Sequence, residues 1–259
     1  MRLQNAFVKK SHIRAIALAA FAALPIFASG ATGAEIKILA SANSALQGAL
    51  TELATQFEGA TGHRLNIAYG SALPLKRIVD AGEPFDILIA PVQVHDSIER
   101  GKVVADTRAM LVRTGLGVGV ARGAPKPDVG SVDALKRTLL AAAAVGYQPD
   151  SEPGMLFLAT LDRLGIAQDV RPRLKVYPTL APMAAALDAR EIAFAVSSIT
   201  NLATVMDVVA FPREAQSPIE TVIGLSATTQ APEAAKALVR FLLSPPAVAV
   251  FEAKGFERE

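Results

Sequence analysis

Four positions in the sequence place small or hydroxyl-bearing residues where a predicted helix follows a predicted strand. They are residues 41–44 (Ser-Ala-Asn-Ser), 70–72 (Gly-Ser-Ala), 150–154 (Asp-Ser-Glu-Pro-Gly) and 179–181 (Thr-Leu-Ala). Ser197 and Ser198 end a further predicted strand. The first N–H groups of a helix have no partner within the helix, and the helix dipole adds positive charge there. Such junctions therefore attract anions.

The expected chemistry at these junctions is anion binding by uncharged donors. In open α/β sheets, ligands collect at the carboxyl ends of the strands, which is where these junctions lie. One hydrogen bond to a charged group contributes about 1.5–3 kcal/mol, so about five or six converging donors suffice to hold a small dianion without Arg or Lys.

Helix capping is the alternative explanation for each junction. Ser, Thr, Asn and Asp are the ordinary N-cap residues of any helix, so a single junction of this kind carries little information. The recurrence of the pattern in both halves of the chain favours ligand binding.

The charge distribution argues against a surface that binds nucleic acid. The chain has 26 Lys and Arg against 24 Asp and Glu, a net charge of +2. Arg2, Lys9, Lys10 and Arg14 lie in the first 34 residues, which contain no acid, so the rest of the chain carries 22 cations against 24 anions. A polyanion-binding stripe is not expected from that balance.

Residues 1–34 have the pattern of a secretory signal peptide. A basic segment is followed by an uncharged apolar run at residues 15–28 and then by small residues at 29–34. The run is shorter than the roughly 20 apolar residues that a membrane span needs. We expect export of a soluble protein to the periplasm, with an uncleaved membrane anchor as the alternative.

The hydrophobic pattern after residue 34 predicts a parallel sheet covered by helices. Strands are predicted at residues 36–40, 65–69 and 86–90, and helices between them at about 44–61 and 75–82. In the first helix Leu46, Leu50, Leu53 and Phe57 form one apolar stripe. Strands that alternate with helices are typical of an α/β fold.

A second α/β unit is predicted between two extended segments, residues 110–120 and 222–227. We interpret these segments as crossovers that form a hinge. Domain one then comprises residues 35–115 and 222–259, domain two comprises residues 116–221, and the ligand cleft lies between the domains. The alternative is that the two segments are ordinary antiparallel strands within one domain.

From residue 35 to its end, the chain resembles the periplasmic molybdate-binding proteins of ABC importers, which are type II substrate-binding proteins. The resemblance is carried by the strand at 36–39 with its Ser-rich turn, residues 54–57 (Ala-Thr-Gln-Phe), 69–72 (Tyr-Gly-Ser-Ala), 80–89 (Asp-Ala-Gly-Glu-Pro-Phe-Asp-Ile-Leu-Ile), 164–165 (Leu-Gly) and 255–256 (Gly-Phe). It implies a two-domain α/β fold. It also implies that a tetrahedral oxyanion is held by two Ser hydroxyls, backbone amides and a Tyr hydroxyl.

The resemblance assigns these donors to positions in this chain. The first Ser falls on Asn43 or Ser44, and the second falls on Ser71 or Ala72, with the ungapped alignment favouring Ala72. One amide falls on Pro153, which has no N–H, so Gly154 or Ser151 must replace it. The second amide falls on Leu180, and the Tyr falls on Ser198. The lost Tyr and Ser remove two donors, at a cost of about 2–5 kcal/mol if nothing replaces them.

The expected ligand is molybdate or tungstate, with another small or organic anion as the alternative. The resemblance implies a monomer that partners an ABC permease in the inner membrane and uses no cofactor. With no Cys and three His, the sequence gives no sign of a metal-cation site. An enzyme on the same scaffold is the less favoured alternative, because neither G-x-S-x-G nor a P-loop occurs.

Overall fold

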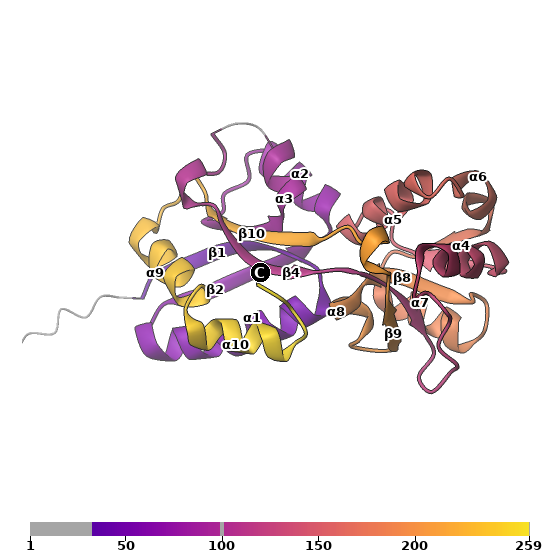
Figure 1. The fold of residues 1–259 in the computed structure, drawn as a ribbon. Helices are drawn as coiled ribbons and strands as arrows, with labels where there is room; N and C mark the ends of the chain where they lie inside the picture. The colour runs from indigo at the N-terminus through magenta and orange to yellow at the C-terminus, as the bar shows by residue number, and fades with distance from the viewer. Residues whose placement is uncertain (1–32, 99–100, 259) are drawn as a thin grey trace, which may run out of the picture. The chain divides into compact units, whose positions relative to one another are not determined.

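The computed structural model describes residues 33–98 and 101–258, which belong to one compact unit (Figure 1). All but the last two residues of the predicted signal peptide lie outside the described residues. Within the described ranges, no single helix is long and apolar enough to cross a membrane, although two consecutive helices, bent by 60°, pass that test as a pair.

The first sheet has the strand order β2-β1-β3-β10-β4. Its strands are β1 (Glu35–Ser41), β2 (Arg64–Gly70), β3 (Ile87–Pro91), β4 (Ala109–Thr114) and β10 (Ile219–Leu225). β1 pairs in parallel with β2 and β3, as predicted, while β10 is antiparallel to β3 and β4. The sheet is therefore mixed, because a strand from the distant end of the chain is inserted next to the parallel unit.

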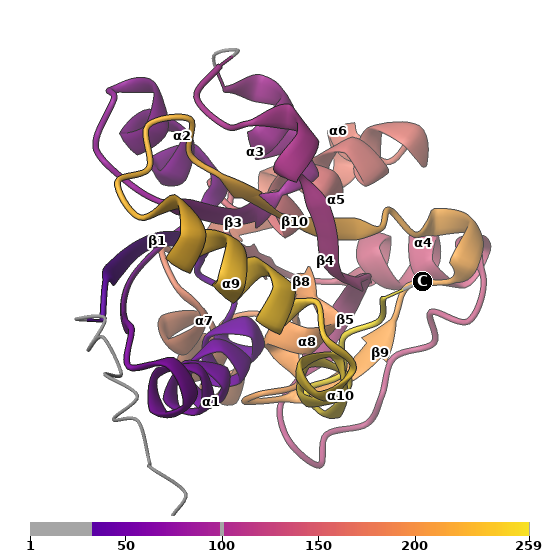
Figure 2. The same cartoon turned by 90° about the vertical axis from the view of Figure 1, so that its left-hand side faces the viewer.

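Helices cover both faces of this sheet (Figure 2). One face carries α1 (Ser44–Thr61), α9 (Pro232–Leu242) and α10 (Pro245–Ala253), and the other carries α2 (Ala72–Asp80) and α3 (Val92–Ser97). Alternate residues of β1 enter the two cores: Ile36 and Ile38 pack with α1, and Leu39 packs with α2. Each such buried aliphatic side chain contributes about 1.5–3 kcal/mol, so both cores fix the position of the strand ends.

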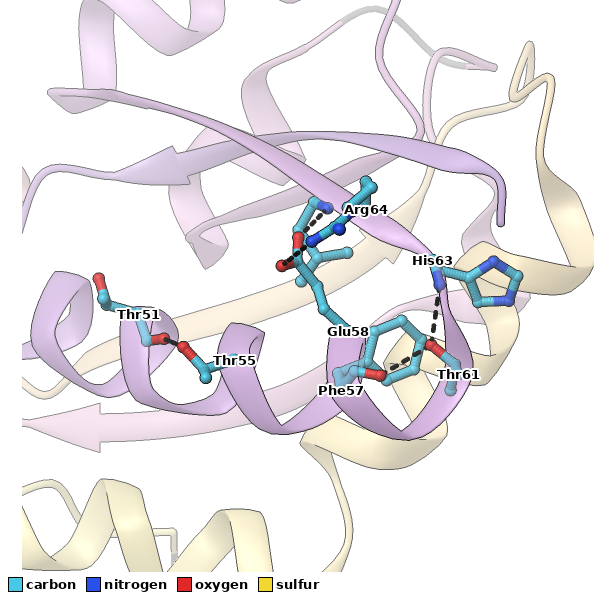
Figure 3. A network of polar contacts seen from close by, with 8 residues as sticks. Thr51, Thr55, Phe57, Glu58, Thr61, His63 and Arg64 are labelled. Carbon is cyan, nitrogen blue, oxygen red and sulfur yellow. Dashed lines mark hydrogen bonds and ion pairs between the residues drawn. The ribbon is translucent and has the colours of Figure 1, made fainter. Parts of the chain in front are cut away.

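A local polar network fixes the turn between α1 and β2 (Figure 3). Gly62 ends α1 with a φ of 73°, a left-handed conformation that favours glycine. Glu58 accepts a hydrogen bond from Leu65 N at 2.7 Å, and Thr61 Oγ1 donates to Phe57 O at 2.7 Å. His63 stacks on Phe57 and accepts from Ala34 N at 3.1 Å, so it has a structural role in this turn.

The second sheet has the strand order β7-β6-β8-β5-β9. Its strands are β5 (Leu116–Val120), β6 (Val145–Tyr147), β7 (Leu174–Val176), β8 (Phe194–Ser198) and β9 (Asp207–Ala210). β6 is parallel to β7 and β8, and β5 is antiparallel to β8 and β9. One core includes α4 (Val132–Ala141), α5 (Glu152–Arg163) and α6 (Ala167–Val170), and the other includes α7 (Leu180–Asp188) and α8 (Ile199–Leu202). Short 3-10 helices occupy Ala105–Thr107, Arg171–Arg173 and Arg213–Ala215.

Two adjacent segments connect the sheets, which we call lobe one and lobe two. Only Gly115 separates β4 in lobe one from β5 in lobe two, and Ile219 of the returning β10 pairs with Thr114. The Gln216 side chain accepts from Leu116 N at 2.9 Å and donates to Leu116 O at 2.9 Å, which ties the two segments together. The fold is thus a two-lobed α/β fold with paired crossovers.

Residues 219–221, expected in domain two, pair in the first sheet. The reason is that β10 extends its pairing with β4 back to Thr114, where β4 itself ends. The division of the chain into two domains that move as units stays a prediction.

Candidate functional site

A small cavity of about 50 Å³ lies where the two lobes meet. Its polar lining is almost entirely uncharged and comprises Ser41, Asn43, Ser71, Thr114, Gln148, Ser151, Ser197, Ser198, Asn201 and Thr221. Glu152 is the one ionisable carboxyl among the described residues that line it, and none of these lining residues is Lys, Arg or His. The cavity is far smaller than the roughly 300–1,000 Å³ of sites for drug-sized ligands, which indicates a small ligand.

Lobe one contributes the starts of α1 and α2. Asn43 caps α1, because its Oδ1 accepts from Leu46 N at 3.0 Å. Ser71 precedes α2, but its side chain makes no cap bond to that helix. The capping explanation therefore accounts for Asn43 and not for the Ser71 hydroxyl, which is at the cavity wall.

Hydrogen bonds join the lobes at one edge of the cavity. Asn43 Nδ2 donates to Ser198 Oγ at 3.0 Å and to Thr200 Oγ1 at 3.2 Å. Ser44 N, at the start of α1, donates to Asn201 Oδ1 at 3.0 Å. The Ser44 N–H has no acceptor within α1, because it lies at the start of the helix, and Asn201 of the opposite lobe accepts its hydrogen bond. These bonds hold the lobes together in the observed arrangement.

Lobe two contributes the start of α5. Ser151 Oγ accepts from Gly154 N at 3.2 Å and donates to Gln148 O at 2.7 Å. A Cβ at position 154 would lie 1.8 Å from Gln148 O, so only glycine allows this close approach. Pro153 has no N–H, and the Ser151 hydroxyl and the Gly154 N–H are engaged within the turn.

Glu152 is the chemically distinctive residue of the cavity. It is 3% exposed, and its Oε2 has no hydrogen-bond partner among the described residues. Burial disfavours the charged carboxylate and raises the pKa of Glu152 from 4.5 to about 7. Ser197, which is 1% exposed, also lines the cavity, and its Oγ likewise lacks a partner in the described part of the chain. Two buried polar atoms therefore remain to be satisfied at this site.

Four of the predicted site residues line the cavity: Asn43, Ser71, Ala72 and Ser198. Their binding role stays a prediction.

The other three predicted residues do not line the cavity. The Ser44 side chain is exposed outside it, and Gly154 lies behind Ser151. Leu180 begins α7 and packs into the core beneath that helix. The turn before α7 is linked to the cavity by Gln148. This residue lines the cavity, and its Nε2 donates to Pro178 O at 3.4 Å.

Glu152 is a lining residue to which the sequence analysis gave no role, although it belongs to the junction at 150–154. An acidic residue in the first turn of a helix is favoured by the helix dipole, so its type gives no sign of a ligand. Three further lining residues were not predicted: Thr114, Asn201 and Thr221. Thr114 and Thr221 lie on the crossover strands β4 and β10, and Asn201 lies in α8, so none of them belongs to a predicted junction.

Chemically, the cavity combines hydroxyl and amide donors with one carboxyl that exchanges a proton near neutral pH. The described residues contain no group of three or more His, Asp or Glu arranged to hold a metal ion.

Comparison with known proteins gives the family. A match to the family described as bacterial extracellular solute-binding protein covers residues 38–257. The aconitate isomerase of a Pseudomonas species is 27% identical over 221 residues, which cover 82% of this chain and 84% of that protein.

Solved structures with the same fold include two anion-binding proteins. The periplasmic molybdate-binding protein of Azotobacter vinelandii matches with a TM-score of 0.70 at 18% identity, over 86% of this chain and 98% of that one. The sulfate-binding protein of Mycobacterium tuberculosis matches with a TM-score of 0.69 at 20% identity, over 87% of each chain. At these identities the likeness shows a fold shared with type II periplasmic binding proteins. With the family match spanning nearly all of the residues after 34, the chain belongs to the bacterial extracellular solute-binding proteins.

Proposed function

We propose that this protein is the solute-binding component of an ABC importer and that it encloses a small anion between its lobes through uncharged donors. The observation that carries the proposal is the composition of the cavity lining. It contains many hydroxyl and amide groups, and none of the described residues that line it is Lys, Arg or His. Such donors are strengthened in an enclosed site, where the local dielectric is low. Closure around a ligand and reopening for release fit two lobes joined by paired crossovers.

Molybdate or tungstate is the first ligand to test. Ser71 and Ser198 carry hydroxyl groups at the cavity wall, whereas Asn43 Nδ2 already donates to Ser198 and Thr200. Ala72 and Pro153 provide no side-chain donor, and Glu152 adds a carboxyl that repels a dianion when it is ionised. These differences favour a ligand that tolerates a carboxyl beside it, so a small organic acid is tested alongside the metal oxyanions.

Export and delivery follow from the same proposal. The signal pattern at residues 1–34 would direct the chain to the periplasm, where a monomer carrying its anion would dock on an ABC permease of the inner membrane.

An isomerase acting on a small unsaturated organic acid is the second candidate function. Two observations favour it: the relative named aconitate isomerase, and the buried Glu152 with a pKa of about 7. A carboxyl with such a pKa can both accept and return a proton near neutral pH. The family and the fold are those of binding proteins, so binding remains the main proposal.

Thermal unfolding with a panel of anions tests the main proposal. Molybdate, tungstate, sulfate, phosphate, citrate and trans-aconitate are each added at millimolar concentration to the exported form of the protein. A ligand at about 100 times its Kd stabilises the folded state by about 2.7 kcal/mol and raises Tm. Absence of a shift with every anion would contradict the proposal.

Two variants localise the binding. Ser71→Ala removes a hydroxyl at the cavity wall that does not cap its helix, so we expect it to reduce the ligand-induced shift. Ser44→Ala is the matched control, because that hydroxyl lies outside the cavity and the Ser44 N–H is retained. Equal losses in the two variants would contradict the placement of the site.

The second candidate is tested by incubating the protein with cis-aconitate and following trans-aconitate by NMR. Turnover that disappears in Glu152→Gln supports an enzyme, whereas binding without turnover leaves the solute-binding role.

A further inference from the structure

The start of α5 places a carboxyl in the cavity without giving it a partner. Glu152 is the first residue of α5, directly after the Ser151 cap, and it is 3% exposed. Its Oε2 and the Ser197 Oγ are both buried and unpartnered, as judged over residues 33–98 and 101–258. Leaving a buried polar atom unsatisfied costs about 1–3 kcal/mol, so two such atoms in one small cavity indicate a missing partner.

A partner that satisfies both atoms must suit a carboxyl as well as a hydroxyl. An ionised carboxylate beside an anion is repulsive, and no cation lines the cavity to offset it. A neutral carboxylic acid instead has an O–H that donates to an anionic oxygen, and a Ser hydroxyl does the same. The anion is then held by two further donors, at the cost of one proton taken up by the site.

We propose that Glu152 contacts the bound anion as a neutral acid and, together with Ser197, donates hydrogen bonds to it, so that the anion and one proton bind together. The inference rests on the proposed function, and it makes Glu152 a residue that determines which anions bind preferentially. Anions that accept strong hydrogen bonds are favoured. The burial that raises the pKa of Glu152 to about 7 keeps the acid form available at neutral pH.

Charged groups on the surrounding elements do not compensate for an ionised Glu152. They are Asp150 before the helix, Asp162 and Arg163 on α5, Asp169 on α6, Lys76, Arg77 and Asp80 on α2, Arg113 on β4 and Glu220 on β10; β8 has none. None of these charged groups lines the cavity. Asp162 lies ten residues along the helix, or about 15 Å away. Arg113 and Glu220 pair with each other at 2.7 Å, so they are not available to Glu152.

The test is the pH dependence of binding, measured by calorimetry with molybdate, tungstate and trans-aconitate between about pH 5 and 9. We expect the affinity of each anion that binds to be constant below about pH 7 and to fall about tenfold per unit above it, because one proton must be taken up. Titrations in buffers of different ionisation enthalpy should report uptake of about one proton near pH 8.

Substitutions separate hydrogen-bond donation from repulsion. Glu152→Gln keeps a donor and removes the titration, so its affinity should match the low-pH value of the wild type at every pH. Glu152→Met keeps the length but has no donor, and we expect about tenfold weaker binding than Glu152→Gln. Equal affinity of the two variants would show that the carboxyl only repels the ligand, and would overturn the proposal. If Glu152→Met does not fold, Ser197→Ala replaces it, with about tenfold weaker binding and an unchanged pH profile expected.

The control is Glu83→Gln, the same chemical change at an exposed position outside the cavity, which should keep the wild-type profile. Binding with no pH dependence and no proton uptake overturns the inference while leaving the proposed function intact. The absence of binding by every probe at every pH overturns both.

Discussion

Among the residues that the structure describes, each lobe buries one carboxyl side chain, and the two differ in their hydrogen bonding. Asp86 in lobe one is 6% exposed and accepts three hydrogen bonds: from Lys37 N at 2.8 Å, Thr229 Oγ1 at 2.6 Å and Gln230 N at 3.2 Å. Glu152 in lobe two is 3% exposed and has an Oε2 with no partner within the described residues. Burial alone therefore does not distinguish the two carboxyl groups, but their hydrogen-bond partners do.

The location of each group explains the difference. Asp86 precedes β3 and joins β1 to the loop after β10, so its hydrogen bonds hold the distant end of the chain against the first sheet. Glu152 lines the cavity, and none of the described residues is a hydrogen-bond partner of its Oε2. The comparison predicts that removing Asp86 destabilises the fold, whereas neutralising Glu152 stabilises it.

The largest expected effect is that of Asp86→Ala. The substitution removes the acceptor of three partly buried hydrogen bonds, and we expect the free energy of unfolding to fall by about 3–5 kcal/mol. Urea denaturation measures it. Asp86→Asn retains one acceptor oxygen and should lose about half as much. A loss below about 1 kcal/mol for Asp86→Ala would show that these hydrogen bonds do not stabilise the fold.

Glu152→Gln should change stability in the opposite direction and only at higher pH. The folded-state pKa of about 7 exceeds the ordinary 4.5, so the wild type loses stability as pH rises from 4.5 through about 7. The full loss is about 3 kcal/mol, at about 1.4 kcal/mol per pKa unit. Relative to the wild type, the variant should therefore gain about 3 kcal/mol between about pH 4.5 and pH 8, as measured by urea denaturation without ligand. A constant difference between the two proteins would be inconsistent with a buried, unpaired carboxyl.

His95 offers a third buried group, with the reverse dependence on pH. It is 5% exposed, its Nε2 lies 3.1 Å from Val222 O, and burial lowers its pKa from 6.5 to about 4. Its neutral form is stabilised by folding, so stability is lost as pH falls from 6.5 through about 4. Relative to His95→Gln, the wild type should lose about 2 kcal/mol between about pH 7.5 and pH 5. Parallel stability curves for the two proteins would rule out a role for His95 in acid destabilisation.

Sequence periodicity was sufficient to predict an α/β fold, because buried strands and amphipathic helices leave patterns in the sequence. The parallel unit β1-α1-β2-α2-β3 was predicted for this reason. The antiparallel insertion of β10 was harder to foresee, since pairing between strands more than 100 residues apart leaves no local pattern. The segment was expected at 222–227, but β10 starts three residues earlier and ends two residues earlier.

The predicted residues that line the cavity all lie at helix starts, and their binding role stays a prediction. Asn43, Ser71 and Ser198 are among them, and the structure brings them to one cavity. Glu152 belongs to the same kind of junction, yet its burial and its lack of partners depend on the packing of α5 against β8 and on the opposite lobe. Leu180 was assigned for its backbone amide, from the junction at 179–181 and from the resemblance, but it does not line the cavity and its side chain packs into the core.

The smallest effect is expected at Asp162, an exposed carboxylate that extends the comparison to the surface. Asp162 accepts two hydrogen bonds from Arg171 Nη2, at 3.0 and 2.9 Å, but the side chains are 58% and 51% exposed. Solvent already stabilises both charges there, so an exposed pair contributes about 0.2–1 kcal/mol and less at high salt. Asp162→Asn should therefore lower the free energy of unfolding by about 0.5 kcal/mol or less, as measured by urea denaturation. A loss as large as that of Asp86→Ala would mean that the number of hydrogen bonds, rather than burial, determines what a carboxylate contributes in this protein.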